Sequence, residues 1–284
     1  FVDIDRSSGN LQFSLVEENL QFQSSRGRLF VVPVHFAGIA FDMRELQNKM
    51  RLNNAVVIED AAHALGSLYP SGEKVGSCAY SDMTILSFHP VKTITTGEGG
   101  MVTTNDPALF HRLKLYRNNG IEKDLPEKPG PWYYEVRGLT GNFHLTEMQA
   151  ALGLSQLKRL TQFVEKRRML VRRYREKLAS VPFIRLFDSA YDERSAYHLF
   201  VAQIDFSALG SSRTQFMQAL NERGIGSQVH YIPLYRHPAL KESMGDLSEY
   251  FPEMEGYYAE ALSLPLYVDL TEEEQDRVVN QLVK

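Results

Sequence analysis

Residues 83–104, MTILSFHPVKTITTGEGGMVTT, set the fold of this 284-residue chain. Apolar runs at both ends of the stretch, residues 83–88 and 101–104, predict two strands. The segment between them ends in Gly97-Glu98-Gly99-Gly100, which gives the backbone freedom to turn. The pattern predicts a strand, a loop that carries Lys92, and a returning strand.

Segments before and after this stretch predict further strands, which alternate with helices. Apolar runs at residues 1–4, 29–35 and 55–59 predict further strands. Helices are predicted at residues 42–52, where Asp42 can serve as the N-cap, and at residues 107–116. Alternation of strands and helices is typical of an α/β domain with a mostly parallel sheet, in which ligands bind at the carboxyl ends of the strands.

The second half begins with a long helical region. Thr146 and Gln149 form a capping-box pattern, and the helix is expected to continue, with a bend, to about residue 178. Beyond Val181-Pro182 the pattern predicts a small α+β domain, with strands at 197–204 and 226–231 and helices at 213–223, 254–261 and 271–282. We therefore expect a large domain over residues 1–160 and a small C-terminal domain over residues 161–284.

Composition narrows the class of protein. The hydrophobic fraction of 43% suffices for one large core or two moderate ones. The net charge of -4 does not indicate the basic surface that a nucleic-acid-binding protein needs. Cys78 is the only cysteine, so we expect no intrachain disulfide, no metal centre and a reducing, cytoplasmic location. No apolar run is long enough to span a membrane. The chain starts at Phe1 without an initiator Met, so we expect the true N-terminus to lie upstream.

Lys92 is the candidate nucleophile. A lysine amine is protonated in water and becomes nucleophilic only where burial or nearby positive charge disfavours the ammonium form. One chemistry that uses such an amine is the Schiff base with pyridoxal phosphate (PLP). A single loop lysine is more often simply solvated, so its neighbours must decide between the two interpretations.

Three neighbours have one functional and one structural interpretation each. Asp60, at the end of the 55–59 run, could hold the protonated pyridine nitrogen of PLP or cap a helix. His63 could contact the cofactor or be a buried structural histidine. Ser87, at a strand end, could bind a phosphate or form a turn.

The order of these motifs resembles one family over nearly the whole chain. The chain is similar to the DegT/DnrJ/StrS family of fold-type I PLP-dependent sugar aminotransferases. The resemblance implies a large α/β domain, incomplete here at its N-terminus, and a small C-terminal α+β domain. It rests on EDAAHALGS (59–67), YSDMTILSFHPVK (80–92), TTGEGGMV (95–102), GNFHLTEMQAALG (141–153), GIGSQVHYIPLY (224–235) and ALSLPLY (261–267).

The resemblance also implies roles for individual residues. Lys92 would bind PLP covalently, Asp60 would pair with the pyridine nitrogen, His63 would lie against the ring, and Ser87 would bind the phosphate. Asn142 would reach the phosphate of the neighbouring subunit's cofactor, which implies a homodimer with a composite active site.

The substrate side of the resemblance points to nucleotide sugars. His230 and Tyr231 would lie near the nucleotide sugar, while Trp132-Tyr133-Tyr134 would contact substrate or pack in the core or at an interface. The family branch most similar to this chain uses L-glutamate to aminate a UDP-linked 4-keto-6-deoxy hexosamine on the way to pseudaminic acid. A UDP-4-amino-4-deoxy-arabinose type of aminotransferase and a non-catalytic nucleotide-sugar-binding relative are the alternatives.

The chain departs from the family pattern at three places. His144 stands where the family usually has an arginine, and Asn119 where it often has a histidine, so neither receives a role. The family's N-terminal phosphate-binding turn has no counterpart in the sequence. We therefore expect residues 1–284 alone to bind PLP poorly.

Overall fold

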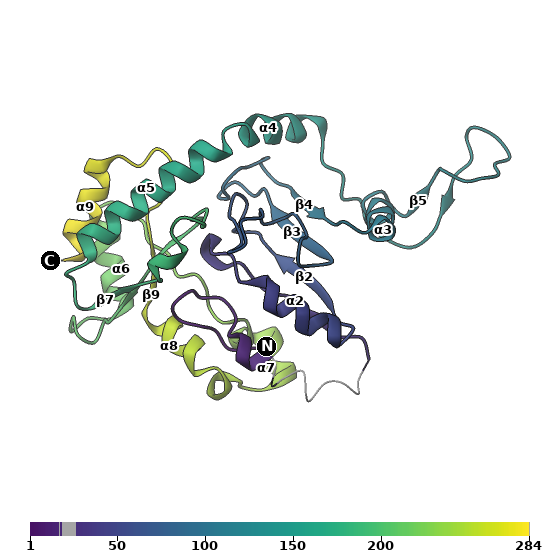
Figure 1. Ribbon diagram of the computed structural model, residues 1–284. Helices are drawn as coiled ribbons and strands as arrows, with labels where there is room; N and C mark the ends of the chain where they lie inside the picture. Colours follow the sequence, from purple (N-terminus) through teal and green to yellow (C-terminus); the bar gives the residue numbers. More distant parts are fainter. Residues whose placement is uncertain (17, 19–26, 284) are drawn as a thin grey trace.

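A four-stranded sheet forms the centre of the first half of the chain (Figure 1). The computed structural model describes residues 1–16, 18 and 27–283. Its first three strands are parallel and the last returns antiparallel, so the predicted strand, loop and returning strand at residues 83–104 are confirmed. The sheet order is β1 (Phe30–Val31), β2 (Val56–Asp60), β3 (Met83–Ser87) and β4 (Gly100–Thr103).

Two helices of the first half begin at aspartate N-caps. In α2 (Met43–Leu52), Asp42 accepts from the backbone N–H of Arg44, as predicted. In α3 (Pro107–Arg117), Asp106 has the same function. The apolar residues Met43, Leu46 and Met50 of α2 are fully buried and anchor the helix to the first core.

The predicted strand at residues 1–4 is wrong. Within the described residues, this segment forms only an isolated pair between Ile4 and Leu11, because the chain turns back on itself there instead of joining the sheet. The 29–35 run is an ordered strand only at Phe30–Val31, with a further isolated pair between Val34 and Asp60.

An arm projects from the body of the molecule (Figure 1). It is the hairpin of β5 (Ile121–Glu122) and β6 (Glu135–Val136). The Trp132 side chain, in the loop between these two strands, is 72% exposed. Of the predicted alternatives for the aromatic cluster at 132–134, packing in a core is therefore wrong for Trp132.

Two successive helices connect the sheet to the second half. The capping box of Thr146 and Gln149 starts α4 (Glu147–Leu157), and the predicted bend separates it from α5 (Leu160–Leu178). Side chains of α5 enter both cores: Phe163 packs in the first, and Leu170 packs in the second. The division into domains at residue 160 stays a prediction.

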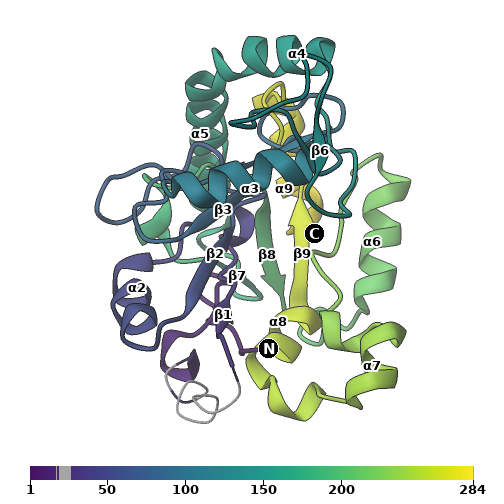
Figure 2. The ribbon, with the colours of Figure 1, turned by 90° about the vertical axis from the view of Figure 1, so that its right-hand side faces the viewer.

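The second half is built on an antiparallel sheet of three strands, β7 (Ile184–Leu186), β8 (Phe200–Ile204) and β9 (Ala261–Leu264). Figure 2 shows β8 and β9 side by side. The remaining helices are α6 (Arg213–Glu222), α7 (Pro238–Met244), α8 (Pro252–Glu260) and α9 (Glu272–Leu282), with short 3-10 turns at Phe36–Gly38, Ser189–Tyr191, Leu234–Arg236 and Ser248–Tyr250.

Two predictions for this half need correction. No strand forms at 226–231 in the described chain, where Gln228 alone pairs with Ser263. Strand β9 was not predicted, because all four of its residues are buried and the run lacks the polar alternation of a half-exposed strand.

A third cluster of buried residues joins the two halves. Ala37 and Ile39, from the turn after β1, pack with Val201 of β8 and Tyr257 of α8. This contact fixes the carboxyl end of the first sheet against the second half of the chain. Within residues 1–16, 18 and 27–283, no helix is both long and apolar enough to cross a bilayer.

Candidate active site

Asp60 lies at the carboxyl end of β2, where a parallel sheet presents ligand-binding groups. Its backbone N–H donates to the Pro33 carbonyl and its carbonyl accepts from the His35 N–H, both at 2.9 Å. One carboxylate oxygen accepts from the Ala62 N–H at 3.1 Å. These hydrogen bonds therefore fix the position of the half-buried carboxylate at the edge of the sheet.

Lys92 sits in the loop that follows β3. Backbone hydrogen bonds close this loop, from Phe88 to the Gly99 carbonyl at 2.8 Å and from Thr96 to the Phe88 carbonyl at 3.0 Å. Burial lowers the pKa of the half-buried Lys92 amine, and the charge of Asp60 partly opposes the shift. The net effect favours the neutral, nucleophilic amine, and it shows that Lys92 and Asp60 share one electrostatic environment.

The hydrogen bonds of His63 fix its protonation. The Ala37 N–H donates to Nδ1 at 3.3 Å, so Nε2 carries the proton and faces the Tyr231 hydroxyl at 3.2 Å. Burial, followed by the charges of Lys92 and His230, lowers the pKa of His63 to about 3. The imidazole is therefore neutral near pH 7. Because His63 donates to Tyr231, the Tyr231 proton is directed to another acceptor.

His198 is a member of this cluster that the sequence did not reveal. Its ring centroid lies 4.4 Å from that of His63, and its side chain is only 6% exposed. Its Nδ1 is buried and finds no hydrogen-bond partner in the described part of the chain. Burial, followed by the charges of His63 and Lys92, strongly lowers the pKa of His198. Its only sequence signal was a histidine in a predicted strand.

His230 and Tyr231 join the site from the second half of the chain. His230 Nδ1 lies 2.7 Å from the Ser263 hydroxyl of β9, and burial and the charge of Lys92 lower its pKa. Burial and the charge of Asp60 raise the pKa of Tyr231. Five of the predicted site residues therefore share one electrostatic cluster: Asp60, His63, Lys92, His230 and Tyr231.

Ser87 and Asn142 lie outside this network of contacts. Ser87 is the last residue of β3, and its hydroxyl accepts from the His89 N–H at 3.4 Å. Asn142 is exposed, and its side-chain oxygen accepts from the His144 N–H. Among the described residues, no hydrogen bond links Asn142 to Asp60, His63 or Lys92. The structure thus leaves Asn142 available to a neighbouring molecule.

The two positions that depart from the family pattern are close to Asn142. His144 Nε2 lies 2.9 Å from the Asn118 side-chain oxygen, and Asn119 has a positive φ of 53°. Asparagine tolerates this left-handed conformation better than most residues. Asn119 therefore serves the turn that brings residue 118 beside residue 142.

A groove of about 690 Å³ opens beside Asp60, His230 and Tyr231. Most of its wall is apolar and comes from the first residues of the chain, from β1 and from α8. Lys92 does not line it. The groove therefore borders Asp60 without including the Lys92 amine.

The donor set of the site fits PLP. The half-buried amine of Lys92 can bond to an aldehyde carbon, and the Asp60 carboxylate can hold a protonated ring nitrogen. Neutral, buried His63 and His198 supply flat faces without positive charge that would compete for Asp60. A phosphate would find the Ser87 hydroxyl at the end of the adjacent strand.

Comparison with known proteins agrees with this chemistry. The model of the DegT/DnrJ/EryC1/StrS aminotransferase family matches residues 1–283. The spore coat polysaccharide biosynthesis protein SpsC of Bacillus subtilis is 34% identical over 283 residues, which are 98% of this chain and 71% of SpsC.

Solved structures give the same result. PseC of Helicobacter pylori, an aminotransferase involved in the biosynthesis of pseudoaminic acid, superposes with a TM-score of 0.89 at 28% identity over 99% of this chain and 72% of PseC. Spr1654 of Streptococcus pneumoniae, described as a sugar aminotransferase and solved in its PLP form, gives a TM-score of 0.82 at 26% identity over 99% of this chain and 73% of Spr1654.

Proposed function

This chain belongs to the DegT/DnrJ/EryC1/StrS family of PLP-dependent sugar aminotransferases, and we propose that it transfers the amino group of L-glutamate to the 4-keto carbon of a UDP-linked 4-keto-6-deoxy hexosamine. The observation that carries the proposal is the half-buried Lys92 amine, which shares its environment with Asp60 and three neutral histidines.

Each residue of the cluster has a role in this proposal. Lys92 would hold the cofactor covalently, and its amine, when free, would move a proton as general base and acid. Asp60 would hold the protonated ring nitrogen, and His63 would lie against the ring. When bound, PLP supplies an electron-accepting ring and carries the amino group between the two substrates.

The likeness to PseC supports the choice of sugar. PseC shares the fold over nearly all of this chain and is involved in the biosynthesis of pseudoaminic acid. The segments at 87–100, 131–136 and 223–234 resemble the same branch of the family. We propose that the product is a 4-amino sugar on the route to pseudaminic acid, with His230 and Tyr231 contacting the nucleotide sugar.

A homodimer is part of the proposal. Asn142 is exposed at the base of the arm and has no contact with Lys92 or Asp60 in the described chain. A composite site, in which Asn142 reaches the phosphate of the partner's cofactor, would give this residue a function.

The test is a glutamate-dependent assay of the full-length protein with PLP and a panel of UDP-4-keto sugars, with the stereochemistry of each product determined. Amination of the 4-keto-6-deoxy hexosamine is expected. Preference for the 4-keto-arabinose substrate would refute the proposed sugar. Borohydride reduction should fix the cofactor on Lys92, and a label on another lysine would refute the assigned nucleophile.

A further inference from the structure

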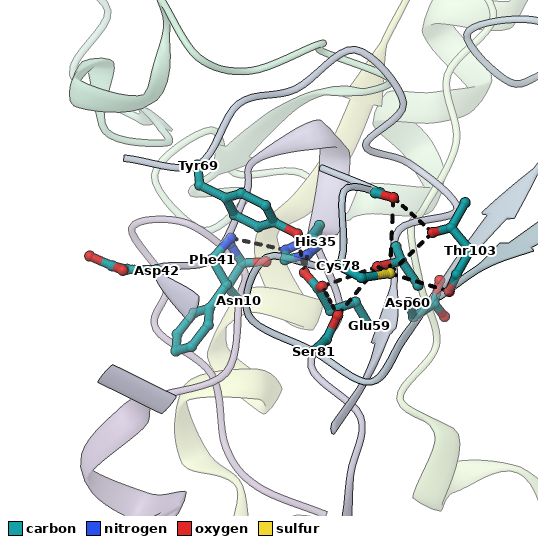
Figure 3. Close-up of polar contacts among 12 residues, drawn as sticks. Asn10, His35, Phe41, Asp42, Glu59, Asp60, Tyr69, Cys78, Ser81 and Thr103 are labelled. Carbon is teal, nitrogen blue, oxygen red and sulfur yellow. Dashed lines mark hydrogen bonds and ion pairs between the residues drawn. The ribbon is translucent and has the colours of Figure 1, made fainter. Parts of the chain in front are cut away.

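Glu59, which precedes Asp60 on β2, is a fully buried carboxylate surrounded by neutral donors (Figure 3). One oxygen lies 2.6 Å from His35 Nε2 and accepts from the Tyr69 hydroxyl at 2.5 Å. The other accepts from the Thr84 hydroxyl at 3.1 Å and from the Ser81 hydroxyl. These four donors occupy the hydrogen-bonding capacity of the carboxylate.

The His35 ring is neutral in this arrangement. The Phe41 N–H donates to His35 Nδ1 at 3.0 Å, so that nitrogen carries no proton and Nε2 donates to Glu59. None of the ion pairs that lysines and arginines make in the described part of the chain involves Glu59. Among the described residues, the one ion-pair partner given for Glu59 is thus His35, which in this tautomer donates a hydrogen bond and carries no positive charge.

Glu59 remains ionised despite its burial. Burial raises the pKa of Glu59, but the hydrogen bonds from His35, Ser81 and Tyr69 oppose this effect, and the pKa lies below its ordinary value. A neutral side chain of similar shape would avoid the cost of burying a charge. The free energy spent on burying this charge indicates that the charge acts on a neighbouring group.

Asp60 is the neighbouring group on which the charge of Glu59 can act. His35 holds both residues at once, because its backbone N–H donates to the Asp60 carbonyl at 2.9 Å while its ring donates to Glu59. Since side chains alternate along a strand, Glu59 is buried behind the sheet while Asp60 faces the Lys92 cluster. A shift of Glu59 or His35 would move Asp60 as well.

We propose that Glu59, clamped by His35, is a positioning residue for Asp60 and a second anion that strengthens the hold of Asp60 on the protonated ring nitrogen of the cofactor. The inference rests on the role of Asp60 in the proposed function. Because the protein interior screens charge weakly, an anion one residue away stabilises positive charge at the Asp60 carboxylate.

Glu59→Gln tests the charge at nearly constant shape. The amide oxygen can still accept from His35 and Tyr69, and the Ser81 and Thr84 hydroxyls can accept from the amide N–H groups. In the full-length protein we expect PLP affinity, titrated by absorbance, to fall roughly ten-fold. The pH midpoint of the bound cofactor's visible absorbance change should move to lower pH, because the protonated form loses a stabilising anion.

Two comparisons separate this from a general loss of packing. Glu222→Gln removes an exposed carboxylate and should change neither PLP affinity nor the midpoint. In an Asp60→Asn background, Glu59→Gln should have little further effect, because its influence passes through Asp60. An equal effect in both backgrounds, or an unchanged affinity and midpoint in the single variant, would overturn the inference.

Ser81→Ala keeps the inference testable if Glu59→Gln does not fold. It removes one donor, so the pKa of Glu59 rises and PLP affinity should decline at a higher pH than in the wild type. An identical pH profile would contradict the inference. These readouts need only protein and PLP, so a protein that behaves as expected but aminates none of the sugars refutes the proposed substrate alone.

Discussion

Burial sets the protonation of the site residues and thereby their reactivity. Lys92, His63 and His198 each have a pKa that burial lowers; the charge of Lys92 also lowers the pKa of both histidines, and the charge of His63 lowers that of His198. A cluster of this kind keeps the amine available without a dedicated base.

Replacement of Lys92 by alanine should abolish amino transfer, with a loss of at least roughly 10³-fold, because in the proposed function one amine both binds the cofactor and moves the proton. The thermal unfolding temperature should change little, since Lys92 is a half-buried loop residue without an ion pair in the described chain. The test measures turnover with glutamate and, by mass spectrometry after borohydride reduction, the cofactor bound covalently to the protein. Retention of the wild-type rate would show that another residue is the nucleophile.

Acid stability should depend on His63. The unfolded side chain binds a proton below about pH 6.5, whereas the folded one does so only below about 3. The unfolded state therefore binds more protons between these values, and the free energy of unfolding falls as pH falls through this window. At pH 5 the His63 contribution amounts to roughly 2 kcal/mol at about 1.4 kcal/mol per unit.

His63→Gln should consequently lose less stability than the wild type between pH 7 and pH 5, measured by urea unfolding. His237→Gln, which removes an exposed histidine, is the matched control and should follow the wild type. Parallel curves for wild type and His63→Gln would show that His63 is not buried in its neutral form.

At the level of elements, the turn after β1 holds the two halves together at Gly38. Its carbonyl accepts from the Ser67 hydroxyl at 2.6 Å and from the Ser195 hydroxyl at 3.0 Å. A Cβ at this position would lie 2.8 Å from the Tyr197 nitrogen and 3.0 Å from the His198 nitrogen. The segment carrying His198 thus approaches the first sheet only because residue 38 has no side chain.

Gly38→Ala should destabilise the protein by more than the roughly 1 kcal/mol expected for alanine at positive φ alone. Gly72→Ala is a close control, since Gly72 has a φ of +96° against +95° at Gly38, but a Cβ added at Gly72 would meet no described atom within 4 Å. Urea unfolding of both variants isolates the steric part. Equal losses would mean that the close approach at Gly38 is not needed.

At the scale of the whole molecule, the arm and the base of α4 expose many large apolar side chains. Leu139 is fully exposed, and Phe143 and Met148 are 69% and 83% exposed. Such a surface is unusual for a monomer and supports the proposed homodimer. Asn142 lies within it.

Mixing two inactive variants tests the composite site. Lys92→Ala and Asn142→Ala, unfolded together and refolded as a mixture, should form heterodimers in which one site has both intact residues, so about a quarter of the wild-type activity returns. The same variants refolded separately are the control. Absence of recovery, with mixed dimers demonstrated by mass, would place Asn142 and Lys92 in the same subunit's site or rule out a role for Asn142.

The local elements near the site follow from patterns in the amino-acid sequence. The strand, loop and strand at 83–104, the Asp42 cap and the Thr146 capping box were predictable because each depends on apolar periodicity or on a hydrogen bond within a few residues. The family, and with it PLP, followed from the order of short motifs.

Which side chains meet depends on the three-dimensional packing of the chain. His198 reaches His63 across 135 positions of sequence, and Glu59 accepts hydrogen bonds from four donors in three separate segments. Charge and burial at such places depend on long-range packing, which no local pattern encodes; the short strand at 1–4 was mispredicted for the same reason. The sequence motifs thus indicate the chemistry of the site, and the packing of the chain sets the protonation states of its residues.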